Sequence, residues 1–97
     1  LPVKKVKYMK TVDGFKLRKV LGESVIVGEG VEQVNYNKLI SLNESASLLW
    51  EAVEGKEFCQ EDLVKVLLDN YEVDEQTARE DVDKMLQEWI SHGLVSL

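Results

Sequence analysis

The first half of the chain has the residue patterns of short strands. Residues 15–20 mostly alternate between apolar and polar side chains, Gly22 interrupts the pattern, and residues 24–28 form a β-branched run that ends in glycine. This order predicts a β-hairpin. After a looser connection that contains glycine and asparagine, residues 38–42 predict a third short strand. We therefore expect a three-stranded antiparallel meander.

The second half has the 3.6-residue spacing of amphipathic helices. Asn43 is a good N-cap for a first helix, and Gly55 suits the position after its end. A second helix is predicted over residues 60–70, with Cys59 as a poor cap. Asp74 caps a third and longest helix. The apolar stripes are Ala46, Leu49, Trp50 and Val53 in the first helix and Ala78, Val82, Met85, Leu86, Trp89 and Ile90 in the third.

These elements predict an α+β domain in which a three-stranded antiparallel meander is followed by three helices on one face of the sheet. The helical half resembles a winged helix-turn-helix domain. Trp50 and Trp89 lie on the apolar stripes of their helices, so core packing is favoured over a stacking platform for a flat ligand. Leu94 and Val95 form a short apolar tail that is expected to close the core.

The charge is divided unevenly along the chain. Residues 1–20 hold seven basic side chains and one acidic, a charge of +6, whereas residues 21–97 hold five basic and 17 acidic, a charge of −12. An acidic body opposes contact with phosphate groups, and the third helix is itself mainly acidic. We therefore expect no nucleic acid partner.

The length of 97 residues predicts one domain. Cys59 is the sole cysteine, which excludes an intrachain disulfide and fits a reducing cytoplasm. No apolar run approaches the roughly 18 to 20 residues of a membrane span, so no membrane partner is expected. Leu1 is not a start methionine, whereas Met9 is a candidate. We expect residues 1–14 to be a flexible basic segment, with residues 1–8 upstream of the native start, and residues 15–97 to be the domain.

The chain has few residues suited to catalysis. His92 is the sole histidine and is predicted at a helix end, far in sequence from Cys59, so no zinc site or Cys-His pair is expected. Gly28-Glu-Gly30 does not open a helix and is no phosphate cradle. We predict no catalytic residue, cofactor or metal. A metal- or cofactor-dependent enzyme stays an alternative that elemental analysis tests.

The third strand leads directly into the first helix, so one of its edges is expected to be open. Such an edge is a template for an extended peptide. Three or four main-chain hydrogen bonds at about 0.5–1.5 kcal/mol each fall short of the roughly 8 kcal/mol of a micromolar complex. Two apolar anchors at about 1.5–3 kcal/mol each would close the difference, in a groove walled by the third helix. The alternative is a solvated edge or one closed by dimerisation.

Several short motifs follow one another in a defined order and spacing. They are Leu42-Asn-Glu-Ser-Ala46, Leu49-Trp50, Gly55, the acidic helix that begins at Asp74, Asp81-Val82 and Gly93-Leu94-Val95. Together they resemble the PqqD family, named for coenzyme PQQ synthesis protein D, over about residues 15–97. The resemblance implies a winged-helix-like RiPP precursor peptide recognition element. Cys59 departs from the family, which commonly has Thr or Ser there.

Such an element is not catalytic: it binds the leader of a ribosomally made precursor as a strand added to the third strand. It acts as a peptide chaperone for a modifying enzyme, often a radical SAM protein, in PQQ biosynthesis or another pathway. The contact residues carried over are Lys38, Leu39, Ile40 and Ser41 on the strand and Ala78, Asp81, Val82, Met85 and Leu86 on the helix, with Leu42, Ala46, Trp50 and Leu94 as core. A helix-turn-helix regulator or a protein-docking adaptor is the alternative, and monomer and homodimer are both open.

Overall fold

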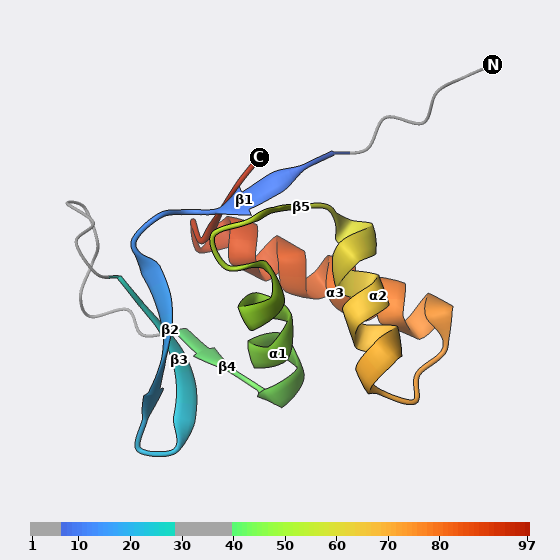
Figure 1. The fold of residues 1–97 in the computed structure, drawn as a ribbon, viewed down its shortest axis with the longest axis horizontal. Helices are drawn as coiled ribbons and strands as arrows, with labels where there is room; N and C mark the ends of the chain where they lie inside the picture. The colour runs from blue at the N-terminus through green and yellow to red at the C-terminus, as the bar shows by residue number, and fades with distance from the viewer. Residues whose placement is uncertain (1–6, 29–39) are drawn as a thin grey trace.

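The computed structural model describes residues 7–28 and 40–97 (Figure 1). The predicted contact residues Lys38 and Leu39 lie outside the described residues. Three helices and two small antiparallel sheets make up the described fold. In chain order the elements are β1 (Met9–Thr11), β2 (Phe15–Val20), β3 (Glu23–Gly28), β4 (Ile40–Leu42), α1 (Glu44–Val53), β5 (Glu57–Phe58), α2 (Gln60–Asn70), α3 (Glu75–Ser91) and β6 (Val95–Ser96).

The first sheet is the predicted meander, in the order β2-β3-β4. β2 and β3 pair as far as Val20 and Glu23, so two residues form the turn. These residues, Leu21 and Gly22, have positive φ angles of 52° and 83°, as in the type I′ turns that match the twist of a hairpin. All three helices lie to one side of this sheet (Figure 1). The α+β fold class and the three-stranded meander are confirmed.

A second sheet, which the sequence pattern did not predict, has the order β5-β1-β6. β1 lies at its centre, with Met9 and Thr11 buried. The hydroxyl oxygen of Thr11 accepts a hydrogen bond from the N–H of Gly55 at 2.8 Å. The expected domain boundary at residue 15 is therefore wrong for Met9–Thr11, because this strand packs into the fold. The assignment of residues 1–8 to a segment upstream of the native start stays a prediction.

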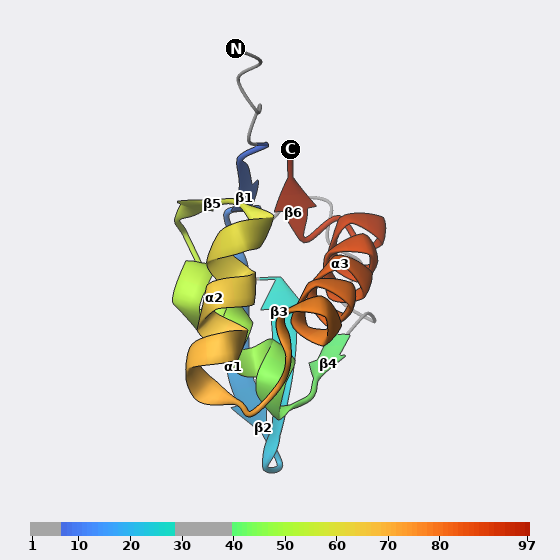
Figure 2. The same ribbon diagram turned by 90° about the vertical axis from the view of Figure 1, so that its right-hand side faces the viewer.

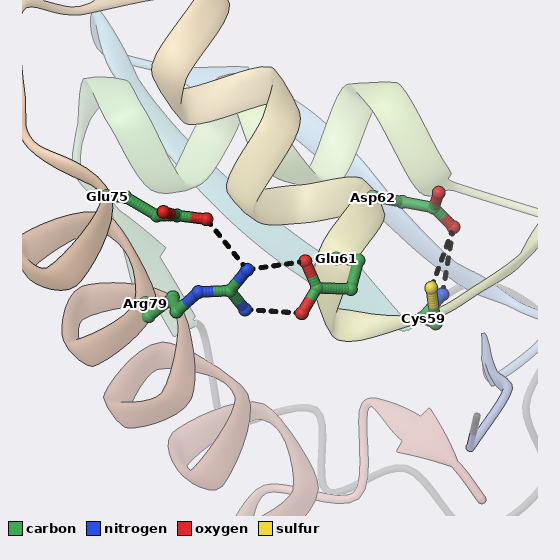
Figure 3. Close-up of polar contacts among 5 residues, drawn as sticks. All are labelled: Cys59, Glu61, Asp62, Glu75 and Arg79. Carbon is green, nitrogen blue, oxygen red and sulfur yellow. Dashed lines mark hydrogen bonds and ion pairs between the residues drawn. The ribbon is translucent and has the colours of Figure 1, made fainter. Parts of the chain in front are cut away.

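The helices begin at the predicted caps. The side-chain oxygen of Asn43 accepts a hydrogen bond from the N–H of Ala46 at 2.8 Å at the start of α1. Asp74 caps α3 in the same way, accepting from Thr77 N–H at 2.7 Å. At α2 the donor and acceptor are exchanged, since the N–H of Cys59 donates to the carboxylate of Asp62 at 3.0 Å (Figure 3). This contact compensates for the weak cap that cysteine supplies.

The core is formed where the helices meet each other and the inner face of the first sheet. Trp50 of α1 and Trp89 of α3 lie edge to face, with ring centroids 5.2 Å apart, and are 0% and 2% exposed. Their predicted core role is confirmed, as is that of Leu94 at the end of the chain. Leu42 and Ala46, also expected in the core, are half-buried. None of the helices in the described part of the chain is long and apolar enough to span a bilayer.

Candidate functional site

A hollow of about 480 Å³ lies between β4 and α3, next to the first turns of α1. Figure 2 shows β4 and α3 on the same side of the molecule, with β3 between β4 and β2. The lining of the hollow combines a mainly apolar floor with polar side chains along the rim. The lining residues are Ile40, Ser41, Leu42, Asn43, Ser45, Ala46, Leu49, Leu67, Asp81, Val82, Lys84, Met85, Glu88, Trp89 and His92.

The floor of the hollow follows from strand and helix periodicity. Ile40 and Leu42 are two residues apart in β4, so both side chains point to the helical side of the sheet, where they are half-buried. Ala46 and Leu49 come from α1 and continue this floor. Met85 completes it from α3 and is likewise half-buried. The result is an apolar surface that a guest side chain can cover.

The orientation of the β4 backbone can be derived from the register of the sheet. The N–H of Leu17 in β2 donates to a side chain, Glu54, at 3.2 Å and therefore points away from β3. Leu17 is paired with Ile26, and Ile26 with Ile40. Since Leu17 and Ile26 form a non-hydrogen-bonded pair, the N–H and C=O of Ile26 point toward β4, and Ile26 and Ile40 form a hydrogen-bonded pair. Backbone directions alternate from one residue of a strand to the next. The N–H and C=O of Ser41 consequently point outward, away from β3.

The two edges of this sheet differ. At the β2 edge, Oε1 of Glu54 accepts both the N–H of Leu17 and the indole N–H of Trp50, at 3.2 and 3.0 Å. A side chain therefore occupies the middle of that edge. At the β4 edge, no other strand of the described residues pairs beyond Ser41, which is exposed. An incoming strand can therefore add beside β4, directly over the hollow.

The structure brings together five of the predicted contact residues, and they line the hollow: Ile40, Ser41, Asp81, Val82 and Met85. Two others do not line it. Ala78 and Leu86 are 0% and 4% exposed and pack in the core. They lie on the inner stripe of α3, which faces the other elements, and so does Val82, which borders the hollow but is 0% exposed. The assignment of these three residues as peptide contacts stays a prediction.

Sequence reasoning missed the polar rim of the hollow. Lys84, Glu88 and His92 line it from α3 and are exposed. Their signal was available in the sequence, since they follow one another at intervals of four residues beside the apolar stripe.

The charged groups near the hollow differ from those that hold the helices together. On another face of α3, Arg79 binds both carboxylate oxygens of Glu61 from α2 and also Glu75, the latter at 3.0 Å (Figure 3). The hydrogen bonds that Arg79 donates, first to Glu61 and then to Glu75, raise the pKa of Arg79 above its ordinary value. Arg79 is thus occupied in joining α2 to α3. In contrast, Asp81, Lys84 and Glu88 have no side-chain partner within the described residues.

The residues considered for catalysis or metal binding are not brought together at the hollow. Cys59 is buried and lies outside it, so it forms no pair with His92 on the rim. Within residues 7–28 and 40–97, no group of histidine, cysteine and carboxylate side chains is placed to hold a metal ion. An open strand edge beside an apolar hollow is instead an arrangement suited to binding an extended chain.

Comparison with known proteins agrees with this geometry. The family model described as coenzyme PQQ synthesis protein D (PqqD) matches residues 23–95. The chain belongs to the PqqD family. The match runs from β3 to β6 and so contains the hollow and its open edge. The predicted family resemblance is confirmed.

A solved structure, that of TbiB1 in complex with the TbiA(beta) leader peptide, has the same fold. The TM-score is 0.69 at 19% sequence identity, and the alignment covers 90% of this chain and 94% of TbiB1. No curated protein matches the sequence significantly. The PqqD-family fold is therefore supported by a sequence match and by a structural match.

Proposed function

We propose that this PqqD-family chain is a non-catalytic peptide-recognition module. It binds the leader of a ribosomally synthesised precursor peptide as a strand added to β4, with leader side chains in the hollow. The observation that carries the proposal is the outward backbone of Ser41 at the β4 edge of the β2-β3-β4 sheet, directly beside that hollow. The structural similarity to TbiB1, solved with a leader peptide, supports the same ligand class.

The energetics of the site fit a guest that uses both backbone and side chains. The outward N–H and C=O of Ser41 supply two hydrogen bonds of about 0.5–1.5 kcal/mol each, so main-chain pairing alone gives weak binding. Two guest side chains on the floor formed by Ile40, Leu42 and Met85 add about 1.5–3 kcal/mol each. Specific recognition therefore depends on the hollow.

The bound leader is presented to a modifying enzyme, either a radical SAM protein or another peptide-modifying class. The module works as a peptide chaperone in the cytoplasm, in PQQ biosynthesis or a related pathway, as a monomer or homodimer. The predicted strand contacts Lys38 and Leu39, which precede β4 in sequence, stay part of this proposal. On the helix side, the guest packs against Asp81 and Met85, and the buried Val82 lies between these two residues in α3.

The decisive test is a substitution that removes only the outward donor. Ser41→Pro deletes an N–H that points away from β3, and proline is tolerated on an edge strand in that orientation. We expect leader binding to weaken at least tenfold, because a main-chain hydrogen bond is lost and the pyrrolidine ring occupies the edge. The measurement is fluorescence anisotropy with the precursor peptide encoded nearest to this gene.

The matched control is Ser41→Ala, which keeps the N–H and should bind as the unchanged chain does. Circular dichroism of both variants verifies that the fold is retained. Equal affinity of the folded Pro and Ala variants would exclude strand addition at β4. Chemical-shift changes on titration give an independent measurement, and they are expected at the backbone amide of Ser41.

A further inference from the structure

The α3 wall of the hollow consists of two parallel rows of side chains, each with a four-residue interval. The inner row is Asp81, Met85 and Trp89, and it is mainly apolar. The outer row is Lys84, Glu88 and His92, and all three side chains are ionisable and exposed. The apolar anchors of a guest fit the inner row. The outer row is charged or ionisable, so binding of apolar guest side chains gives it no role.

Charges in the outer row are not used within the fold. Lys84 and Glu88 are four residues apart, yet no hydrogen bond or ion pair joins their side chains or binds them to other described residues. One physical reason is that lysine before glutamate is the less favourable order for such a helical pair. Arg79 on the same helix is held by two carboxylates. The outer row is therefore available to a guest, whereas Arg79 is not.

The spacing of the outer row matches that of an extended guest. Four residues of helix rise about 6 Å, and two residues of strand advance about 6.6–6.8 Å. A guest strand that runs parallel to α3 along the groove can therefore bring alternate side chains near Lys84, Glu88 and His92 in turn. The side chains between them point away from α3, so the apolar anchors of the guest lie at other positions on its α3-facing side.

We infer that the outer row selects the order of charges in the guest, an inference that rests on the proposed peptide-binding function. The favoured guest has an acidic side chain opposite Lys84 and a basic side chain two positions along, opposite Glu88. Exposed ion pairs contribute little affinity, but placing like charges opposite one another is unfavourable, so their effect is on discrimination. A guest with the same composition and the reverse order binds more weakly.

The experiment is a selection of random 12-residue peptides displayed on phage, carried out on two proteins in parallel. One is the unchanged chain, and the other is the double variant Lys84→Glu with Glu88→Lys, which conserves net charge. Synthetic versions of the selected peptides are then measured by anisotropy against both proteins. The matched control is Lys65→Glu with Asp69→Lys, which exchanges charges at the same interval on an exposed face of α2 outside the hollow.

The expected result is an acid and a base two positions apart in the peptides selected on the unchanged chain, in one order, and in the opposite order on the double variant. Each protein should prefer its own peptides by roughly tenfold at low salt, with less preference at high salt. The α2 control should behave as the unchanged chain does. Peptides that shift the Ser41 amide but show no charge order would overturn the inference and leave the proposed function intact. Selected peptides that leave the Ser41 amide unaffected would overturn both.

Discussion

Glu54 is a single side chain that serves both the core and the sheet edge. One of its carboxylate oxygens accepts the indole N–H of Trp50, which is 0% exposed, and the same oxygen accepts the edge N–H of Leu17. Without this acceptor, a buried donor is left without a partner, which costs about 1–3 kcal/mol. Glu54 therefore contributes more to stability than its place at the end of α1 indicates.

A first prediction concerns this residue. Glu54→Ala is expected to lower the free energy of unfolding by about 1–3 kcal/mol because the donor of Trp50 loses its acceptor. Glu54→Gln keeps an acceptor oxygen, so its free energy of unfolding is expected to fall by clearly less than that of Glu54→Ala. Urea denaturation followed by tryptophan fluorescence measures both. Identical stabilities for the two variants would show that the carboxylate is not the acceptor that matters.

At the scale of elements, α3 combines a stability role with a binding role. Its inner stripe packs in the core, its flank lines the hollow, and Asp74 fixes where it begins. Hydrogen bonds from Thr77, first from its side chain and then from its backbone, lower the pKa of Asp74 below the ordinary value of 3.8. The cap is therefore strongest while this carboxylate is ionised.

The pH dependence of the cap gives a second prediction. Because the pKa is lower in the folded state, the stabilisation is complete above the unfolded value and is lost as pH falls through the folded pKa. Asp74→Asn also caps but does not titrate in this range. As the pH is lowered below about 4, the Tm of the unchanged chain should therefore fall more than the Tm of the Asp74→Asn variant. Thermal circular dichroism measures both values. A difference that stays constant from neutral to acid pH would contradict this account.

Elements differed in how well the sequence predicted them. Asn43 and Asp74 supplied clear helix starts, and the turn at Leu21 and Gly22 separated two alternating segments, so α1, α3 and the hairpin were predicted correctly. β5 and β6 have two residues each and β1 has three, and segments this short show no recognisable alternation of apolar and polar residues. Their formation depends on contacts distant in sequence, such as that of Thr11 with Gly55.

The same physical limit applied to the candidate site. The family resemblance placed Ile40, Val82 and Met85 among the contact residues, and all three line the hollow. It placed Ala78 and Leu86 there too, and which face of α3 meets the core is decided by the packing of the other helices. Lys84 and Glu88 have the polarity of ordinary surface residues, and the adjacent hollow distinguishes them from the rest of the surface.

For the molecule as a whole, β1 connects the two ends of the described chain. It lies between β5 and β6, and the N–H of Val12 donates to the C=O of Leu94 at 2.9 Å. Figure 1 shows this sheet at the opposite side of the helices from the hairpin turn. Residues that were expected in a flexible segment therefore pair with strands from the second half of the chain.

A third prediction follows from β1. A chain that starts at Phe15 loses the burial of Met9, about 1.5–3 kcal/mol, and all pairing to β5 and β6. We expect it to unfold at a clearly lower urea concentration than the full chain. Thr11→Val, which removes only the acceptor for Gly55, should lie between the two. Unchanged stability of the shortened chain would restore the boundary at residue 15.

The unequal edges of the β2-β3-β4 sheet have a consequence for stoichiometry. Glu54 binds the N–H of Leu17 in the middle of the β2 edge, whereas β4 is bordered by the hollow, so we expect the sheet to lengthen on the β4 side. A guest strand added to that border lies beside α3, which walls the hollow. We therefore expect one guest strand at the β4 edge of each molecule.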